Sequence, residues 1–462
     1  MSPNIIKTAI LVIHGVGPHE RYQACDVFSR GLLEAFKEEG NGIKKKHVLK
    51  PRDQGVQSCI SLYTPGNKES IDCYEYFWDT YMVQKVSPSE GWDLLVKASK
   101  NAQRFYNNVI KNREVASKIV DKKGRVTSPL FRKRLTRRTT NFYRRIRKQE
   151  VESDLEFKPY GYLRIFGGWG TIILVTIIPY IRPVISLLEF LSSKQIPVVT
   201  QVYGVLSSII KTLAGVFKNQ LEKAFMRDLV VYLDMDPRSN HYETRQKIID
   251  GAVNELCALM EDNYDQIIIA GHSLGSVIAY DALNRIILQI NTGKIDQKKA
   301  VKIKGLVTFG SPLDKIAFFF NENVTSKEKI RRKILADTHT FRTISLLDEK
   351  NDIENPEPFW VFPEVRWLNF WHPKDMISGK LDLYDLSKVQ PKHVGTLKED
   401  GTKEGNIKIE ANMKFLAAHG CYWGVPQGKE KEKAKDKAKE KTKKKDTVTS
   451  QMQKAIIDEF LS

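Results

Sequence analysis

The segment Gly271-His272-Ser273-Leu274-Gly275 follows an apolar run and opens a helical pattern with one apolar face. A serine with a glycine two positions away on each side is typical of a strained turn that presents its hydroxyl at the tip of a strand. Small residues are needed there because larger side chains would collide with neighbouring backbone. Ser273 is therefore the candidate nucleophile for acyl transfer. A glycine-rich strand-to-helix turn without chemistry is the competing interpretation.

Acyl transfer also requires N–H donors for the negatively charged oxygen of the tetrahedral intermediate. The residue after the nucleophile, Leu274, predicts one backbone donor. The second donor is expected from a loop after an early strand, and His14-Gly15-Val16-Gly17 has that position. We expect the N–H of Val16, or of a neighbour such as Gly15, to serve. His14 could also be an ordinary core histidine.

The acid of a serine–histidine–carboxylate set should follow the serine in the chain and precede the histidine. Asp375 comes just after an expected strand, and such a loop can reach a histidine behind Ser273. Asp348 is the next candidate. Asp314 is expected to shape the pocket floor instead. Each of the three could also be a simple turn or cap aspartate.

The same order leaves His419 and His393 as candidate bases. His419 is preferred because small residues surround it and leave an imidazole room to approach the serine. His393 is expected in a surface turn, and His372 could act only if Asp348 were the acid. Residues expected at the substrate pocket are His272, Phe318 and Phe319, although the phenylalanines also suit a plain core.

Elements that could position these residues alternate along the chain, which predicts an α/β fold with a mostly parallel sheet flanked by helices. Residues 74–118 are expected to be helical, with mixed polarity. The expected strands are Ala9–Ile13, Val56–Tyr63, Gln266–Ala270, Leu306–Phe309, Thr343–Leu347 and Val365–Phe370. The expected helices are Tyr22–Glu39, Tyr242–Glu261, Ser276–Ile290 and a short terminal helix, Met452–Leu461.

Charge is concentrated in two segments of this 462-residue chain, whose net charge is +19. Residues 111–150 hold 15 Lys and Arg against 3 acidic residues, and residues 429–446 hold 10 Lys against 5. The remainder is close to neutral, which argues against a nucleic-acid partner and favours local contact with something anionic. We expect two parts of one hydrolase domain, 1–110 and 226–426, around an insertion, 111–225, followed by a lysine-rich tail, 427–462.

The insertion contains two uncharged runs, 165–181 and 195–210, each near the lower length limit of a membrane span. If the strands before Gly15 and Ser273 share one sheet, both ends of the insertion lie on one side of the bilayer. That allows two spans, or a re-entrant or in-plane hairpin. The basic flank at 132–148 places the catalytic domain in the cytoplasm. The alternative is a cap over the site in a soluble cytoplasmic protein.

The five cysteines are scattered along the chain, which predicts free thiols.

Several blocks resemble those of lipase- and esterase-type α/β-hydrolases, in their usual order. They are the strand and loop ending in His14-Gly15-Val16-Gly17, residues 271–283, residues 307–314, Trp367 to Asp375, and residues 418–423. Residues 74–78 and 228–232 resemble an uncharacterised bacterial branch with an apolar insertion. The resemblance covers residues 5–80 and 228–424. It implies the α/β-hydrolase fold and hydrolysis of carboxylic esters, with lipids favoured.

These observations predict an ester hydrolase in which Ser273 attacks, His419 takes the proton and Asp375 orients the imidazole. No metal or organic cofactor is implied. The expected partners are a lipid or small ester substrate and an anionic membrane surface. The alternatives are a thioesterase or deacylase that acts on a lipidated partner, and a non-enzymatic membrane scaffold that keeps the fold.

Overall fold

The computed structural model describes most of residues 6–83, a continuous stretch around Ser273 from 223 to 313, and shorter pieces elsewhere. The described residues are 6–17, 19–38, 40, 42–52, 55–66, 70–83, 86–87, 90, 94, 125, 223–313, 316, 362, 365–375, 377–379, 381, 405–409, 418–423 and 448–461. Most of the insertion therefore lies outside the described residues, as do the expected strand Thr343–Leu347 and most of the lysine-rich tail.

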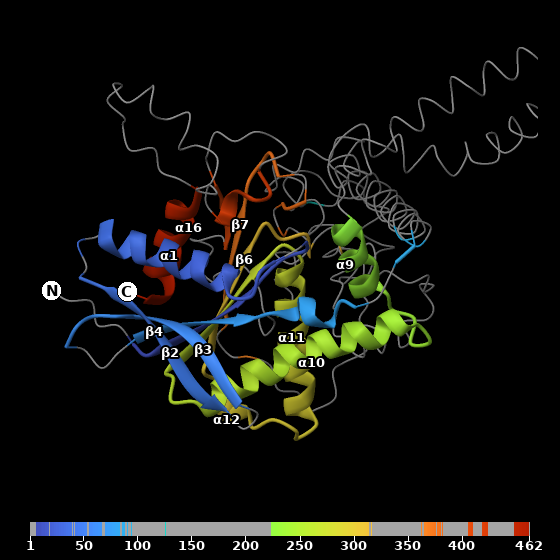
Figure 1. The fold of residues 1–462 in the computed structure, drawn as a ribbon, viewed down its shortest axis with the longest axis horizontal. Coiled ribbons are helices and arrows are strands. Elements are labelled where there is room, and N and C mark those ends of the chain that lie inside the picture. Colours follow the sequence, from blue (N-terminus) through green and yellow to red (C-terminus); the bar gives the residue numbers. More distant parts are fainter. Residues whose placement is uncertain are drawn as a thin grey trace, which may run out of the picture.

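The strands of the described residues form one eight-stranded sheet (Figure 1). Their order in the sheet is β2-β3-β4-β1-β5-β6-β7-β8. The six strands from β4 to β8 along this order are parallel to one another, and β3 is antiparallel to both β2 and β4. Their bounds are β1 Thr8–Ile13, β2 Lys44–Arg52, β3 Gly55–Tyr63, β4 Ser70–Tyr76, β5 Gln266–His272, β6 Ile303–Phe309, β7 Arg366–Trp371 and β8 Asn406–Lys408.

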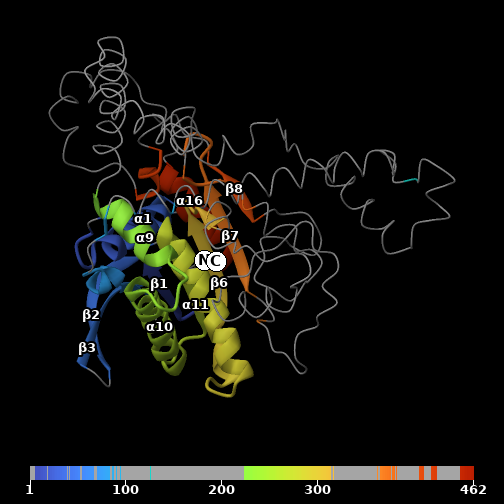
Figure 2. The ribbon, with the colours of Figure 1, turned by 90° about the vertical axis from the view of Figure 1, so that its right-hand side faces the viewer.

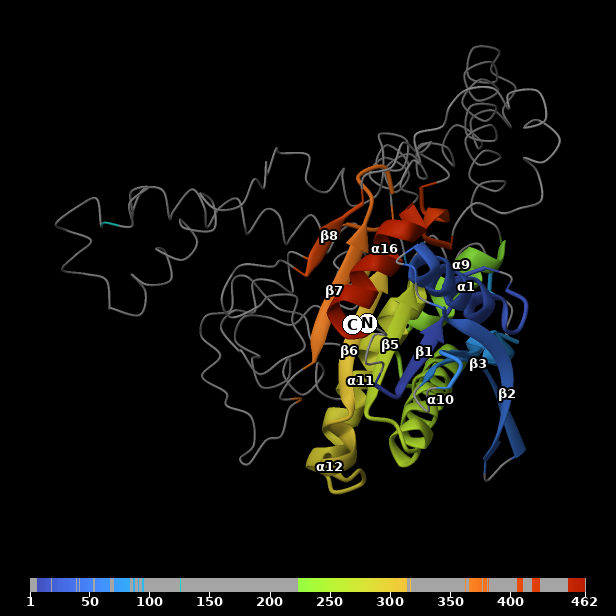
Figure 3. The same ribbon diagram turned by 90° about the vertical axis from the view of Figure 1, so that its left-hand side faces the viewer.

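Helices cover both faces of this sheet, which makes the fold α/β. Helices α9 (Lys223–Leu233), α10 (Asn240–Glu261) and α11 (Leu274–Asn291) lie on one face, as Figure 2 shows. Helices α1 (Gln23–Glu38) and α16 (Val448–Ile456) pack together on the other (Figure 3). Strand β1 illustrates the reason, because Ala9, Leu11 and Ile13 join one apolar cluster and Ile10 and Val12 join the other. A strand buried on both faces needs such a continuous apolar run.

One expectation from the sequence is wrong, because residues 74–76 belong to strand β4 rather than to a helix. The polar residues of β4 have structural partners inside the protein. Glu75 accepts hydrogen bonds from the N–H groups of Ala24 at 3.0 Å and Cys25 at 3.3 Å, at the start of α1. A carboxylate at a helix N-terminus satisfies donors that have no acceptor within the helix. The strand is followed by a short 3₁₀ helix, η1 (Trp78–Tyr81).

The chain end is part of the core. Helix α16 continues as a π-helix, η6 (Ile457–Leu461), and the Phe460 ring lies directly over β6. A Cβ atom on Gly305 would be only 2.7 Å from that ring, so glycine is required at this crossing. Gln266 donates to the Phe460 carbonyl at 2.7 Å, and Arg366 pairs with Glu459 at 2.8 Å. The expected terminal helix therefore exists and completes one face of the sheet.

Strands β1 and β5 are direct neighbours, so the two halves of the chain around the insertion share one sheet. Within the described residues, no helix has both the length and the apolar character that a membrane crossing requires. All five cysteines are described, and all are free thiols.

Candidate active site

Ser273 sits at the sharp turn between β5 and α11. Its backbone has φ 49°, one of two positive values among described non-glycine residues, so the turn is strained. The turn can be this tight because a Cβ on Gly271 would come within 2.6 Å of the Gly275 carbonyl. A Cβ on Gly275 would collide with the carbonyls of Ile13 and His14. The glycines predicted to provide room therefore do so by letting backbone segments touch.

Hydrogen bonds at both its N–H and its carbonyl hold the backbone of Ser273. Its N–H donates to the Phe309 carbonyl at 3.1 Å, and its carbonyl accepts from the N–H of Ser276 at 3.0 Å and from the Ser276 hydroxyl at 2.5 Å. Ser276 is held in turn by Ser311 through a hydroxyl contact of 2.7 Å. The hydroxyl of Ser273 is thus presented by a rigid frame that involves β5, β6 and α11.

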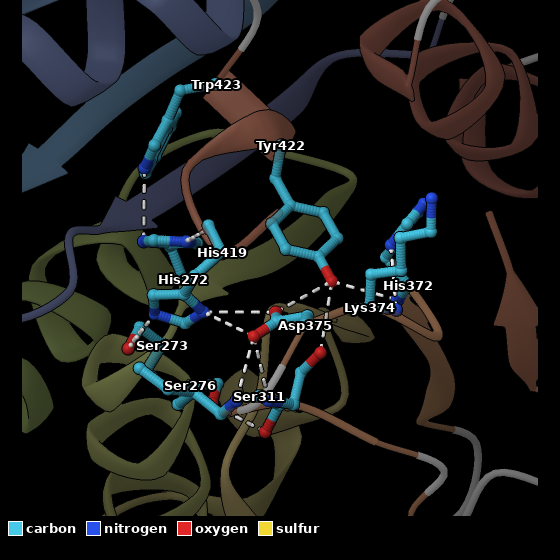
Figure 4. Close-up of polar contacts among 12 residues, drawn as sticks. His272, Ser273, Ser276, Ser311, His372, Lys374, Asp375, His419, Tyr422 and Trp423 are labelled. Carbon is cyan, nitrogen blue, oxygen red and sulfur yellow. Dashed lines mark hydrogen bonds and ion pairs between the residues drawn. The ribbon is translucent and has the colours of Figure 1, made fainter. Parts of the chain in front are cut away.

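His419 lies between Ser273 and Asp375 and bonds to both (Figure 4). Its Nε2 is 2.9 Å from the Ser273 Oγ, and its Nδ1 is 3.1 Å and 3.0 Å from the two Asp375 carboxyl oxygens. A carboxylate can only accept, so Nδ1 carries the proton and Nε2 accepts from the serine hydroxyl. This arrangement can remove the proton of Ser273 as its oxygen attacks a carbonyl carbon. The structure therefore brings together the three residues that the sequence ranked first.

Asp375 is buried and held by several donors. The N–H groups of Ile377 and Ser378 donate to its Oδ1 at 2.9 Å and 3.2 Å, and the Tyr422 hydroxyl donates to Oδ2 at 3.0 Å. Burial raises the pKa of the Asp375 carboxyl, but the hydrogen bonds from His419 and these neighbours lower it more, so it ends well below its usual value. Asp375 is consequently ionised at neutral pH.

Tyr422 is a site residue that the sequence interpretation missed. It is fully buried, and its hydroxyl lies within 3.1 Å of Ser378 and accepts from the His372 N–H at 3.0 Å (Figure 4). His372 is therefore placed behind Tyr422, where its Nδ1 accepts from the Lys374 N–H at 3.1 Å. The signal that could have identified Tyr422 is its closeness in sequence to His419, which it follows by three residues. Tyr422 lies in a short 3₁₀ helix, η5 (Cys421–Trp423).

His272, which was expected at the substrate pocket, lies against the backbone of His419. Its Nδ1 accepts from the Trp423 indole N–H at 3.1 Å, so Nε2 carries the proton and donates to the His419 carbonyl at 3.2 Å. Burial lowers the pKa of His272 well below its usual value, so the ring is neutral. Both ring nitrogens are engaged, and His272 orients the backbone that carries His419.

A buried polar network holds the loop that begins at Asp375. The Asn369 side chain accepts from Thr308 at 3.0 Å and donates to the Gly379 carbonyl at 3.1 Å and to Asn406 at 2.9 Å. Asn406 also accepts from the Leu381 N–H at 3.1 Å. The network spans β6, β7 and the edge strand β8, so the loop that begins at Asp375 is anchored to the last three strands of the sheet.

Two of the predicted oxyanion residues, Gly15 and Leu274, lie beside Ser273. A Cβ on Gly15 would be 2.8 Å from the Ser273 Cβ, so the loop after β1 touches Ser273. Leu274 is the first residue of α11, and the first N–H groups of a helix have no acceptor within it. The remaining candidates, Asp314, Asp348, His393, Phe318 and Phe319, lie outside the described residues.

Comparisons with protein-family models, with curated proteins and with solved structures find no match. Among the described residues, no group of three or more His, Cys, Asp or Glu side chains is placed to hold a metal ion.

Proposed function

We propose that this protein is a serine hydrolase of the α/β-hydrolase type that cleaves carboxylic esters, with lipid esters the favoured substrate class. The observation that carries the proposal is the continuous hydrogen-bonded chain from the Ser273 hydroxyl through His419 to the ionised Asp375. It stands on a strained turn between a parallel strand and a helix, which is the context that a nucleophilic serine of this fold requires.

The proposed reaction has two steps. The Ser273 oxygen attacks the ester carbonyl while His419 Nε2 takes its proton, and the imidazolium is stabilised by Asp375. Collapse of the tetrahedral intermediate breaks the ester C–O bond, and His419 returns the proton to the departing alcohol. Water then attacks the acyl-enzyme with His419 again as the base, which releases the acid and restores Ser273.

The lipid preference and an anionic membrane contact rest on the sequence. The uncharged runs at 165–181 and 195–210 and the basic segment at 111–150 fit an enzyme that works at an anionic lipid surface. Turnover of short-chain esters in solution but not of phospholipid vesicles would restrict the proposal to small esters. A thioester substrate on a lipidated partner would appear as thioester cleavage that exceeds ester cleavage.

The decisive test is labelling with a fluorophosphonate probe together with ester turnover. Ser273→Ala should abolish labelling and lower kcat by roughly 10⁴-fold or more, because the acyl-enzyme cannot form. Ser29→Ala is a matched control, since Ser29 is a buried serine on α1 whose hydroxyl donates to the Asp26 carbonyl. It should keep the label. Unchanged labelling or turnover in Ser273→Ala would remove the proposal.

A further inference from the structure

The loop between β1 and α1 contains two consecutive peptide groups, and each is held by a buried side chain. The first joins Gly15 to Val16. Its carbonyl accepts from the ring of His14, with Nδ1 at 2.9 Å from the Gly15 oxygen. Because a trans peptide group points its C=O and N–H in opposite directions, this contact turns the Val16 N–H away from the His14 ring.

His14 is well suited to hold that peptide in one orientation. Its ring is fully buried and stacks on Trp78, with centroids 5.0 Å apart and the planes 10° from parallel. The Trp78 indole N–H donates to the His14 carbonyl at 2.9 Å. Burial lowers the pKa of His14 to about 3, so the ring is neutral and its single proton lies on Nδ1, facing the carbonyl.

The second peptide group joins Val16 to Gly17, and its N–H is already taken. The Gly17 N–H donates to the Asp228 Oδ2 at 3.0 Å, although Asp228 lies 211 positions away on α9. Arg227 binds the other carboxyl oxygen of Asp228 through Nε at 2.9 Å and reaches Asp79 at 3.0 Å. The His19 ring also donates to the Val16 carbonyl, which belongs to this second peptide group. Gly17 therefore has no N–H to offer a substrate.

Within the described residues, no hydrogen bond is made by the Val16 N–H, although Val16 directly follows the glycine that touches Ser273. We propose that His14 and Asp228 are positioning residues that together select the Val16 N–H as the second oxyanion donor, beside the N–H of Leu274. Asp228 accepts the Gly17 N–H and thereby holds the loop in place. His14 binds the Gly15 carbonyl and so fixes the direction of the Val16 N–H, which remains available. This inference rests on the proposed ester hydrolysis and assigns residues to it outside the Ser273, His419 and Asp375 set.

Asparagine at position 228 tests the inference with little change of shape. Asp228 accepts from Gly17 on one oxygen and from Arg227 on the other, and asparagine has only one acceptor, so one donor must face its NH₂ group. We expect Asp228→Asn to lower kcat by roughly 10- to 100-fold, short of the 10²–10³-fold that follows complete loss of one oxyanion donor. KM for the same ester should stay close to the wild-type value, because the donor acts mainly on the transition state.

Asp79→Asn is the matched control, because it removes a carboxylate from the same Arg227 without touching Gly17. It should keep wild-type kcat. A trifluoromethyl ketone, whose serine adduct carries the oxyanion, should lose affinity for Asp228→Asn by the factor lost in kcat/KM. If the substitution only made the site less well ordered, the variant would lose affinity for the substrate as well as for the inhibitor. Equal kcat losses in the two variants, or unchanged kcat in a folded Asp228→Asn, overturn the inference.

Substitutions of His14 test the inference independently, in case Asp228→Asn does not fold. His14→Asn keeps an N–H donor near the position of Nδ1, whereas His14→Leu removes it. We expect His14→Asn to retain more kcat than His14→Leu at equal thermal stability, and equal kcat values contradict the inference. Failure of the proposed function would be seen in the wild-type protein, as the absence of both ester turnover and fluorophosphonate labelling. That result would overturn the inference as well.

Discussion

Asp375 is surrounded by donors that come from its own loop and from the turn after His419. Two backbone N–H groups and the Tyr422 hydroxyl leave the carboxylate little freedom to rotate, so the His419 ring is held with Nε2 toward Ser273. Hydrogen bonds to an ionised group are stronger than those between neutral groups. The acid is therefore a stabilising feature of the native protein as well as a part of the proposed mechanism.

This dual role predicts a pH dependence for Asp375→Asn. The lowered pKa of Asp375 means that its contribution to stability is complete above the usual carboxyl pKa of about 3.9 and is lost as the pH falls further, toward the native value. At pH 7 the variant should be less stable than wild type by about 1.5–3 kcal/mol, the scale of charged hydrogen bonds. Thermal unfolding from pH 7 down to pH 3 measures whether this difference shrinks below pH 4.

The control is Asp236→Asn, which changes an exposed carboxylate paired with the exposed Arg238. Its stability should match wild type throughout, because exposed ion pairs contribute little. A difference between Asp375→Asn and wild type that stays constant down to pH 3 would contradict the assignment of a lowered pKa to Asp375.

The sequence predicted Ser273, His419 and Asp375 better than the residues that hold them in place. Ser273 was recognisable because its motif is local, and Asp375 and His419 because their order after the serine is restricted. The sequence interpretation placed His272 at the substrate pocket rather than against His419, and it did not identify Asp228 as a supporting residue. Their roles depend on contacts with Gly17 and Trp423, each more than 150 positions away, which only the folded chain creates.

Strands β1 and β5 were predicted because each contains a continuous apolar run. Strand β3, in which polar and apolar residues are mixed, was also predicted, as Val56–Tyr63. The ones missed have polar residues with partners elsewhere in the fold. Strand β4 carries Glu75, which caps α1, and β2 is an exposed edge strand with three consecutive lysines, Lys44–Lys46. Charged residues on an edge strand discourage pairing with another chain, but they also hide the strand from a search for apolar alternation.

Helix α16 contains a buried polar side chain, and its replacement by an apolar one should stabilise the protein. Gln453 is fully buried, and neither polar atom of its side-chain amide has a hydrogen-bond partner among the described residues. Burial of an unsatisfied amide costs about 1–3 kcal/mol, whereas leucine of similar size would bury apolar surface. We expect Gln453→Leu to raise the thermal unfolding midpoint without changing ester turnover. Gln297→Leu, an exposed position on helix α12 (Gln297–Ala300), should leave the midpoint unchanged. A lower midpoint in Gln453→Leu would show that the amide is satisfied in solution.

At the scale of the whole molecule, the site is assembled from segments spread over the chain. The loop after β1 supplies the proposed oxyanion donor, the turn after β5 supplies Ser273, and the segments after β7 and β8 supply Asp375 and His419. The chain then returns through α16, which packs against α1 and against the η5 turn that holds Tyr422 and Trp423. The last helix is thus a support for the site as well as a cover for the sheet.

Removal of residues 448–462 should therefore disable the site along with the fold. The helix buries five large apolar side chains, Met452, Ile456, Ile457, Phe460 and Leu461. At about 1.5–3 kcal/mol each, their burial amounts to roughly 8–15 kcal/mol as an upper estimate, which equals the total stability of an ordinary domain. We expect the shortened chain to bind a hydrophobic dye, to lose its cooperative thermal transition and to lose ester turnover. A synthetic peptide of residues 448–462 should restore part of the turnover, and the same peptide with Phe460→Asp should not, because the ring over Gly305 would be replaced by a buried charge. A shortened chain that keeps wild-type turnover would show that the catalytic groups are held without the last helix.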